Sequence, residues 1–190
     1  REGADFIFSF SLASFKSLRE QKIESAYMDQ GGKDYFYDKM NYAYLFAPTI
    51  GLSKEIIPKT DFSKVSIRLS GEIGPSVAIL KPYYLEVVRP INPTTGVVEI
   101  KPYDPVQYNW TNILGEADFF LGMDELKVRP GLRARGAFSV DFSRTKDYIR
   151  AIEAGLTADF FPKAPEIMGL RKNPNLYIGG SIGILFGNAW

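Results

Sequence analysis

The feature that most constrains the fold is the stretch from Lys64 to Leu80, KVSIRLSGEIGPSVAIL, because two kinds of side chain alternate along it. Its odd-numbered positions carry no charge and are mostly large and apolar. Its even-numbered positions are mostly small or polar and include Arg68 and Glu72. A period of two is typical of a β-strand whose two faces meet different surroundings. The stretch therefore predicts a strand, and the rest of the chain must indicate which face meets water.

The same alternation recurs along most of the chain. Six further segments show it: 5–15, 41–53, 113–121, 131–142, 151–160 and 176–187. Segments 84–88 and 97–101 are expected to pair as a hairpin around residues 92–96. No long segment repeats apolar residues at the helical spacing i, i+3, i+4 and i+7, so we predict an all-β chain with seven clear strands. An even number of strands suits a closed barrel, and we expect the eighth within 81–112 or in the first loop.

Composition excludes several classes of function. Lys plus Arg number 23 and Asp plus Glu number 22, so a net charge of +1 gives no electrostatic reason to expect nucleic acid as a partner. The sequence has no run of about 18 apolar residues, so no membrane-spanning helix is predicted. Mean hydropathy is −0.11, and alternating strands of a membrane barrel average to such neutral values.

Histidine and cysteine are both absent from the 190 residues. The chain therefore lacks the commonest general base, the commonest metal ligand and any disulfide or thiol chemistry. The carboxylates Glu116 and Asp118 lie two apart, but we interpret them as part of a charge-paired wall rather than as a catalytic pair. We expect no enzyme activity, no cofactor and no metal.

The charged residues of the predicted strands share the face opposite the apolar one. They are Arg68, Glu72, Glu116, Asp118, Arg133, Arg135, Asp141, Glu153 and Asp159. A soluble sandwich would turn this face to water and would commonly carry Lys there, whereas these mid-strand positions hold Arg, carboxylates and small residues. Arg paired with carboxylates tolerates a crowded interior better than Lys does. We therefore predict an all-β, transmembrane, antiparallel up-and-down β-barrel of eight strands with this charge network in its lumen, and a soluble barrel or sandwich is the alternative.

Function is expected in the loops, because an eight-stranded barrel is just filled by its own side chains and offers no pore. The whole chain, 1–190, is predicted to be one barrel domain with two long loops, 16–40 and 81–112. The second loop holds five aromatic candidates for a protein contact: Tyr83, Tyr84, Tyr103, Tyr108 and Trp110. Prolines restrict its backbone, which lowers the entropy lost on docking. The same aromatics would equally suit a loop packed on its own barrel.

Short motifs in residues 64–190 carry a resemblance to a known family. KPYYLEV, the Pro-Gly of VRPGLRARG, IRAIEAGLTADFF and the closing YIGGSIGILFG resemble a small outer-membrane β-barrel family of Bacteroidota. Its members include accessory barrels of envelope machines, such as the PorG-type subunit of type IX secretion. The end of the chain, FGNAW, is similar to the C-terminal signal of bacterial outer-membrane barrels. The resemblance implies an eight-stranded barrel without catalytic residues.

These observations together lead to one expected function and one alternative. We expect a non-enzymatic barrel of the cell outer membrane that acts as a structural or docking subunit of an envelope protein complex, in secretion or outer-membrane protein assembly. Its partners would be outer-membrane lipid and other envelope proteins. The alternative is a β-barrel that binds a small apolar ligand or lipid.

Overall fold

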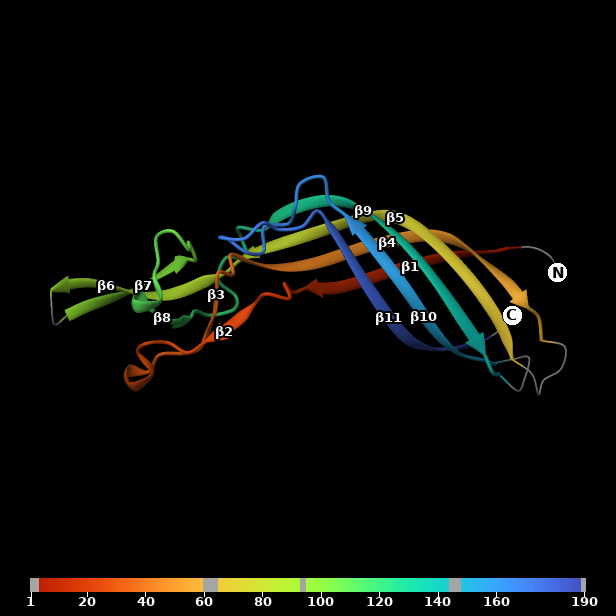
Figure 1. Ribbon diagram of the computed structural model, residues 1–190, viewed down its shortest axis with the longest axis horizontal. Coiled ribbons are helices and arrows are strands. Elements are labelled where there is room, and N and C mark those ends of the chain that lie inside the picture. Colours follow the sequence, from red (N-terminus) through yellow and green to blue (C-terminus); the bar gives the residue numbers. More distant parts are fainter. Residues whose placement is uncertain (1–3, 60–64, 93–94, 144–147, 189–190) are drawn as a thin grey trace.

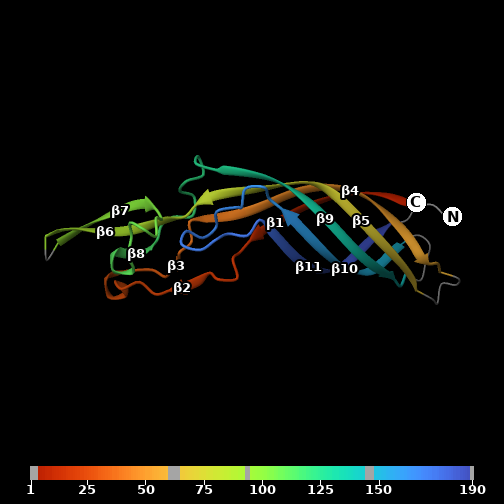
Figure 2. The ribbon, with the colours of Figure 1, turned by 45° about the horizontal axis from the view of Figure 1, so that its top comes forward.

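The computed structural model describes residues 4–59, 65–92, 95–143 and 148–188, and the chain is all-β apart from two short 3-10 turns. Six antiparallel strands form the main sheet in the order β1-β4-β5-β9-β10-β11. Their bounds are β1 Asp5–Phe15, β4 Asn41–Ile57, β5 Ser66–Pro82, β9 Lys127–Asp141, β10 Tyr148–Phe160 and β11 Leu176–Asn188. The sheet curls into a half-barrel (Figures 1 and 2), and β1 and β11 are its two edges.

A smaller unit, here called the extension, projects from one end of the curled sheet (Figure 1). It contains β2 Gln21–Ile23, η1 Met28–Gln30, β3 Tyr35–Tyr37, β6 Tyr84–Asn92, β7 Thr95–Pro102, η2 Trp110–Asn112 and β8 Ile113–Glu116. Strands β2 and β3 pair with each other, and β7, β6 and β8 form a three-stranded sheet in that order. The extension is therefore made by the two long segments that interrupt an otherwise continuous meander of strands.

The burial pattern of β5 shows which face of the opening stretch is turned outward. Leu69 and Ile73 are 53% and 62% exposed, whereas Glu72 and Ser76 on the opposite face are 6% and 0% exposed. The polar face is the concave, buried one, and the apolar face is the convex, exposed one. This arrangement is the reverse of a water-soluble sandwich, in which the apolar face forms the core.

Tight backbone contact between β4 and β5 accompanies the curl of the sheet. Their register runs from Asn41↔Pro82 to Phe46↔Val77 and resumes at Ile50↔Ile73. In the interval, a Cβ atom on Gly74 would lie 2.1 Å from the carbonyl oxygen of Pro48, so only glycine fits there. Pro48 also lacks the N–H that a regular ladder would use.

The structure confirms the all-β, antiparallel reading and corrects one predicted strand. The predicted hairpin is present as β6 and β7, with Val88 opposite Val98. The predicted strand 113–121 is wrong: only Ile113–Glu116 is extended, and it pairs with β6 in the extension. Its alternation reflects the buried side of the extension, because Ile113 is 0% exposed and packs in that core.

The predicted closed barrel of eight strands is matched only in part. Six strands form the curled sheet, and within the described ranges β1 pairs only with β4 and β11 only with β10. Segment 81–112 does not supply an eighth wall strand. Its strands β6 and β7 form part of the extension, together with β8. Lys64, residues 93–94 of the hairpin turn, and the terminal Trp190 of the FGNAW motif lie outside the described residues.

Candidate functional site

The concave face of the sheet holds a buried ion pair between β9 and β10. Arg133 and Asp159 are directly opposite in the register, and both guanidinium-to-carboxylate contacts measure 2.8 Å. The two side chains are 7% and 4% exposed. A bidentate, desolvated pair of this kind satisfies both groups in a setting where either alone would be costly.

A second cluster on the same face joins four strands. Arg135 of β9 donates to Glu72 of β5 and to Glu153 of β10. The hydroxyl of Thr49 on β4 donates to the other oxygen of Glu72 at 2.7 Å. The structure therefore brings five of the predicted network residues together in two adjacent groups. The register places Arg133 opposite Asp159 and Arg135 opposite Glu72, and the long side chain of Arg135 also reaches Glu153, which lies further along β10.

The remaining predicted network residues lie apart from these groups. Arg68 pairs with Asp5 of β1 at 3.2 Å, and both side chains are largely exposed. Asp141 accepts from Lys59 at 3.0 Å and from the backbone of Ser143, near the end of β9. Sequence reasoning missed Asp5 and Lys59 because they lie at strand ends and far along the chain from their partners.

Two residues assigned to the lumen lie elsewhere, and this part of the prediction is wrong. Glu116 belongs to β8 of the extension and accepts a hydrogen bond from the hydroxyl of Tyr42. Asp118 is exposed and accepts from the backbone N–H of Phe120 at 2.8 Å, which stabilises a turn. Both errors follow from treating 113–121 as a wall strand.

The five aromatic contact candidates divide into core and surface residues. Tyr83 and Tyr103 are 1% and 3% exposed and form the core of the extension with Tyr35, Leu85, Val87 and Ile113. The prediction that these two tyrosines contact a partner is wrong, because no partner could reach them in this fold. Burial raises the pKa of the Tyr103 phenol to about 12 and also raises the pKa of Tyr83.

The other three candidates are more accessible. Trp110 is 58% exposed on the turn η2. Tyr108 is half-buried against the extension core, and the hydroxyl of Tyr84 donates to Glu125 at 2.8 Å. Of the five, Trp110 is therefore the one that remains openly displayed.

A more extensive exposed surface lies on the β6–β7 hairpin. Its two faces differ, because Leu85 and Val87 point into the extension core while Val88, Val98 and Ile100 lie on the opposite face. Val98 and Ile100 are 51% and 50% exposed. We call Val88, Val98 and Ile100 the hairpin face. The alternation of side chains in TGVVEIKP, residues 95–102, is the feature of the sequence that indicates this face.

Buried contacts hold the extension against the sheet. The ammonium group of Lys39 pairs with Glu20 at 2.8 Å and lies 4.2 Å from the ring centre of Tyr42. The ammonium group of Lys81 lies 4.6 Å from the ring centre of Phe119 and donates to the carbonyl of Leu121. Burying two lysines is tolerated because each has aromatic and oxygen partners. The extension is thus fixed to the sheet rather than tethered by a loop.

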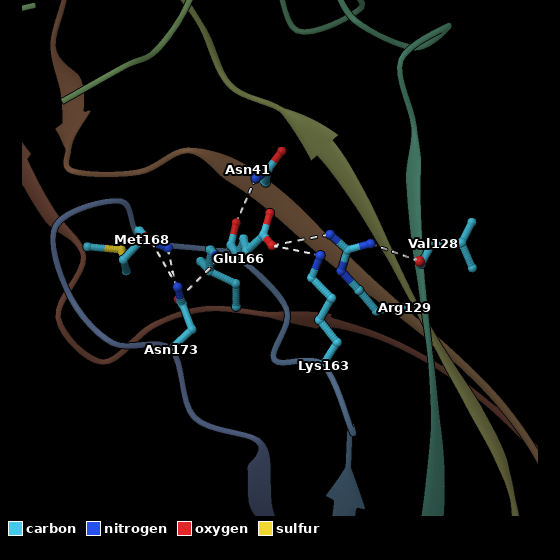
Figure 3. Close-up of polar contacts among 8 residues, drawn as sticks. Asn41, Val128, Arg129, Lys163, Glu166, Met168 and Asn173 are labelled. Carbon is cyan, nitrogen blue, oxygen red and sulfur yellow. Dashed lines mark hydrogen bonds and ion pairs between the residues drawn. The ribbon is translucent and has the colours of Figure 1, made fainter. Parts of the chain in front are cut away.

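The loop between β10 and β11 folds over the extension end of the concave face (Figure 3). Glu166 pairs with Arg129 at 3.2 Å and its carbonyl accepts from Asn41 at 2.6 Å. The side chain of Asn173 accepts from the backbone of Met168 at 2.9 Å and donates back to its carbonyl at 2.8 Å. These bonds shape a compact plug, from which Phe161, Ile167 and Met168 are buried against β4 and β5.

A cavity of about 1150 Å³ lies beside this plug, where the two edges of the sheet approach each other. Residues after β1 and before β11 line it, together with Leu45 and Met168. The rings of Phe15 and Tyr177 stack across the edges with their centres 4.6 Å apart. This cavity, here called the seam cavity, was not predicted from the sequence because it depends on the curvature of the sheet.

No group of three or more Asp and Glu side chains in the described segments is arranged to hold a metal ion. In the same segments, no helix has the length and apolar character needed to cross a membrane.

Comparison with known proteins finds no match to a family model, to a curated protein or to a solved structure. The resemblance to the Bacteroidota barrel family therefore stays a prediction, and the function must be argued from the geometry.

Proposed function

We propose that the curled sheet is the wall of a transmembrane β-barrel of the outer membrane, and that the protein acts there as a structural or docking subunit of an envelope protein complex. The observation that supports the membrane location is the inverted burial of the sheet. Its concave face buries ion pairs and its convex face displays large apolar side chains.

The convex surface is apolar on every strand. Its exposed members include Phe6, Phe8, Phe10 and Leu12 of β1, Ile50 and Leu52 of β4, Leu69 and Ile73 of β5, Leu132 and Phe138 of β9, Ile152 and Leu156 of β10, and Ile178, Ile182, Ile184 and Phe186 of β11. They are 49–91% exposed. Soluble monomers rarely expose contiguous apolar patches larger than a few hundred Å². Lipid is the solvent that favours such a surface.

The height of this surface suits a bilayer. On β11 the apolar outward residues extend from Ile178 to Phe186, and on β10 from Ile152 to Phe160. A tilted strand needs about 9–11 residues to cross the hydrocarbon layer. Strands β4 and β5 are 17 residues long, so they continue beyond the layer and lead into the extension.

In its more specific form, the proposal is a closed barrel of eight strands. In the antiparallel order, β1 and β11 run in opposite directions, so direct pairing or the addition of an even number of strands would close the sheet. Closure is favoured in lipid because unpaired backbone groups at an edge are costly there.

The interior supports a structural role rather than transport. The pairs around Arg133 and Arg135 occupy the middle of the concave face, and Phe161, Ile167 and Met168 occupy its extension end. These groups occupy much of the interior beside the seam cavity, which favours surface contact over transport as the main function.

The hairpin face is the proposed docking surface. It is mostly apolar, with Glu86 across from Ile100 as its charged neighbour. It lies on a paired strand ribbon, and the extension is anchored by the buried lysine contacts described above. A pre-organised apolar surface loses little entropy when a partner covers it. Exposed apolar side chains of this kind at the tip of a rigid projection are typical of protein contacts.

The membrane location is tested by fractionating cells that make the chain. We expect recovery in the outer membrane only with detergent, and a gel mobility that changes on heating. Recovery in the soluble fraction without detergent would contradict the proposal.

The docking role is tested with a matched pair of substitutions on neighbouring residues. Val98→Asp lies on the hairpin face, whereas Val97→Asp lies on the opposite face of the same strand, 42% exposed and across from Arg89. We expect Val98→Asp to abolish co-purification of envelope partners while Val97→Asp preserves it, with insertion unchanged in both. Equal partner yields for the two variants would show that the contact lies elsewhere.

A further inference from the structure

We propose that the seam cavity binds an anionic phospholipid, with the headgroup at a ring of four cations and an acyl chain along the apolar wall between the two sheet edges. This inference rests on the proposed membrane location. It assigns to the barrel a specific lipid site in addition to its general contact with the bilayer.

The cations come from both sides of the seam. Lys16 and Arg19 follow directly after β1, and Arg171 and Lys172 precede β11, and all four line the cavity. Within the described ranges, none of the four forms an ion pair with a carboxylate. Positive charge converging from two separate segments on one opening is complementary to a phosphate-bearing headgroup.

The cavity offers no competing negative charge. Asp159 is the one carboxylate among its described lining residues, and Arg133 neutralises it through the bidentate contact. The net charge at the opening is therefore positive even though the whole chain is nearly neutral. Within the described residues, no carboxylate neutralises this local positive charge, which is why we assign the four cations to ligand binding.

The walls are suited to an acyl chain. Phe15, Leu45, Ile167 and Tyr177 are among the lining residues, and their surfaces are apolar. The hydroxyl of Tyr177 is buried and has no hydrogen-bond partner among the described residues. That hydroxyl is fully buried, so the ring of Tyr177, and not its oxygen, is the part that can contact an acyl chain.

The depth of the site agrees with the position of a headgroup. The last exposed apolar side chains of the two edge strands before the cations are Leu12 on β1 and Leu176 on β11, 73% and 50% exposed. Cations just beyond the apolar band lie where lipid phosphates are found, and basic residues there attract anionic lipids.

The test uses the full chain purified in detergent and reconstituted in nanodiscs containing equal amounts of phosphatidylglycerol and phosphatidylcholine. Native mass spectrometry measures which lipid stays bound after the nanodisc is removed. We expect phosphatidylglycerol to be retained about tenfold more than phosphatidylcholine, from the attraction of several cations to one headgroup. Equal retention of the two lipids by an inserted, heat-modifiable chain would overturn the inference.

Two variants and a control locate the site. Arg171→Glu with Lys172→Glu should remove the preference, whereas Lys54→Glu with Lys101→Glu, the same change in charge away from the cavity, should preserve it. Ala13→Trp keeps the cations but fills the cavity, and should lower retention of both lipids. Unchanged retention in Ala13→Trp would show that lipid binds only to surface charge and would refute the cavity site.

A competition experiment separates a lipid from a free anion. Millimolar inorganic phosphate should leave the bound phosphatidylglycerol in place, because the acyl chain supplies part of the affinity. Displacement by phosphate would identify a simple anion site and overturn the lipid assignment. Failure of the chain to insert at all would instead contradict the proposed function.

Discussion

The strands of the curled sheet and those of the extension both alternate polar and apolar residues, but the two regions bury opposite faces. In the extension, Leu85 and Tyr83 are buried and charged groups such as Arg89 and Glu99 pair at the surface, 2.9 Å apart. In the sheet, Arg133 and Asp159 are buried while Ile182 and Phe8 are 86% and 74% exposed. One chain thus contains both an ordinary water-facing unit and an inverted one.

With the proposed membrane location, this difference means that the two regions are adapted to two solvents. Apolar surface is driven out of water, so a core of tyrosine, leucine and valine stabilises the extension in an aqueous compartment. In lipid that drive is absent on the outer face, and the costly groups are the polar ones, which the sheet collects inside. The substitutions below exploit this contrast.

The largest expected effect comes from breaking the buried ion pair of the sheet. Asp159→Ala should destabilise the chain by about 3–5 kcal/mol, because it leaves Arg133 buried without a partner. Asp5→Ala, which removes the exposed partner of Arg68, should cost about 0–1 kcal/mol. Denaturant unfolding of the detergent-solubilised chain measures both, and similar losses would mean that water reaches the concave face freely.

The second contrast compares leucines in the two regions. Leu85→Ala in the extension core should cost about 2–5 kcal/mol through lost burial and a new cavity. Leu132→Ala on the convex face of β9, where the side chain is 60% exposed, should cost much less. Protection of backbone amides from hydrogen exchange should fall around β6–β8 in the first variant only, and a loss centred on the sheet would contradict the assignment of separate cores.

The third contrast uses two isoleucines with nearly equal exposure. Ile73 on the sheet is 62% exposed and Ile91 on the hairpin is 60% exposed. Ile73→Arg should cost about 2–4 kcal/mol in a bilayer near its midplane. Ile91→Arg should change stability by no more than about 0.5 kcal/mol, as is usual for a surface in water. Folding titrations in lipid vesicles compare the two, and equal small effects would argue that the convex face meets water.

The smallest expected effect is an alkaline pH dependence of the extension. Because the pKa of Tyr103 is raised to about 12 from an ordinary value of about 10, the folded extension keeps this proton where the unfolded chain loses it. Its contribution to stability is complete below about pH 10 and is lost as the pH rises through about 12. Trp110 fluorescence should report loosening of the extension in this range while the sheet remains heat-modifiable. Tyr103→Phe should weaken the dependence, and an unchanged alkaline transition in that variant would exclude Tyr103 as its source.

Much of the sheet could be predicted because strand periodicity is local. The alternation at 5–15 matches β1 at both ends, and the hairpin of β6 and β7 was expected from two short runs around a turn. The shared parity of Arg133, Arg135 and Glu72 also placed these groups on one face before the register was known.

Other features could not be read from periodicity. The segment 113–121 alternates like a wall strand, but Ile113 is held by the core of Tyr35 and Tyr103, so the chain remains in the extension there. The same core explains why two of the five aromatic candidates are buried, since aromatic residues suit a core and an interface equally well.

The sequence by itself determined that the chain is all-β, that its strands have one apolar and one polar face, and that histidine and cysteine chemistry is absent. Only the tertiary structure decided that the polar face is the concave one, that Arg68 meets Asp5 while Arg133 meets Asp159, and that four cations converge on the seam cavity. The physical reason is the distance along the chain over which each effect acts. Alternation is imposed by neighbouring residues along a strand, whereas the side that becomes the interior is set by curvature and register between strands far apart in the chain.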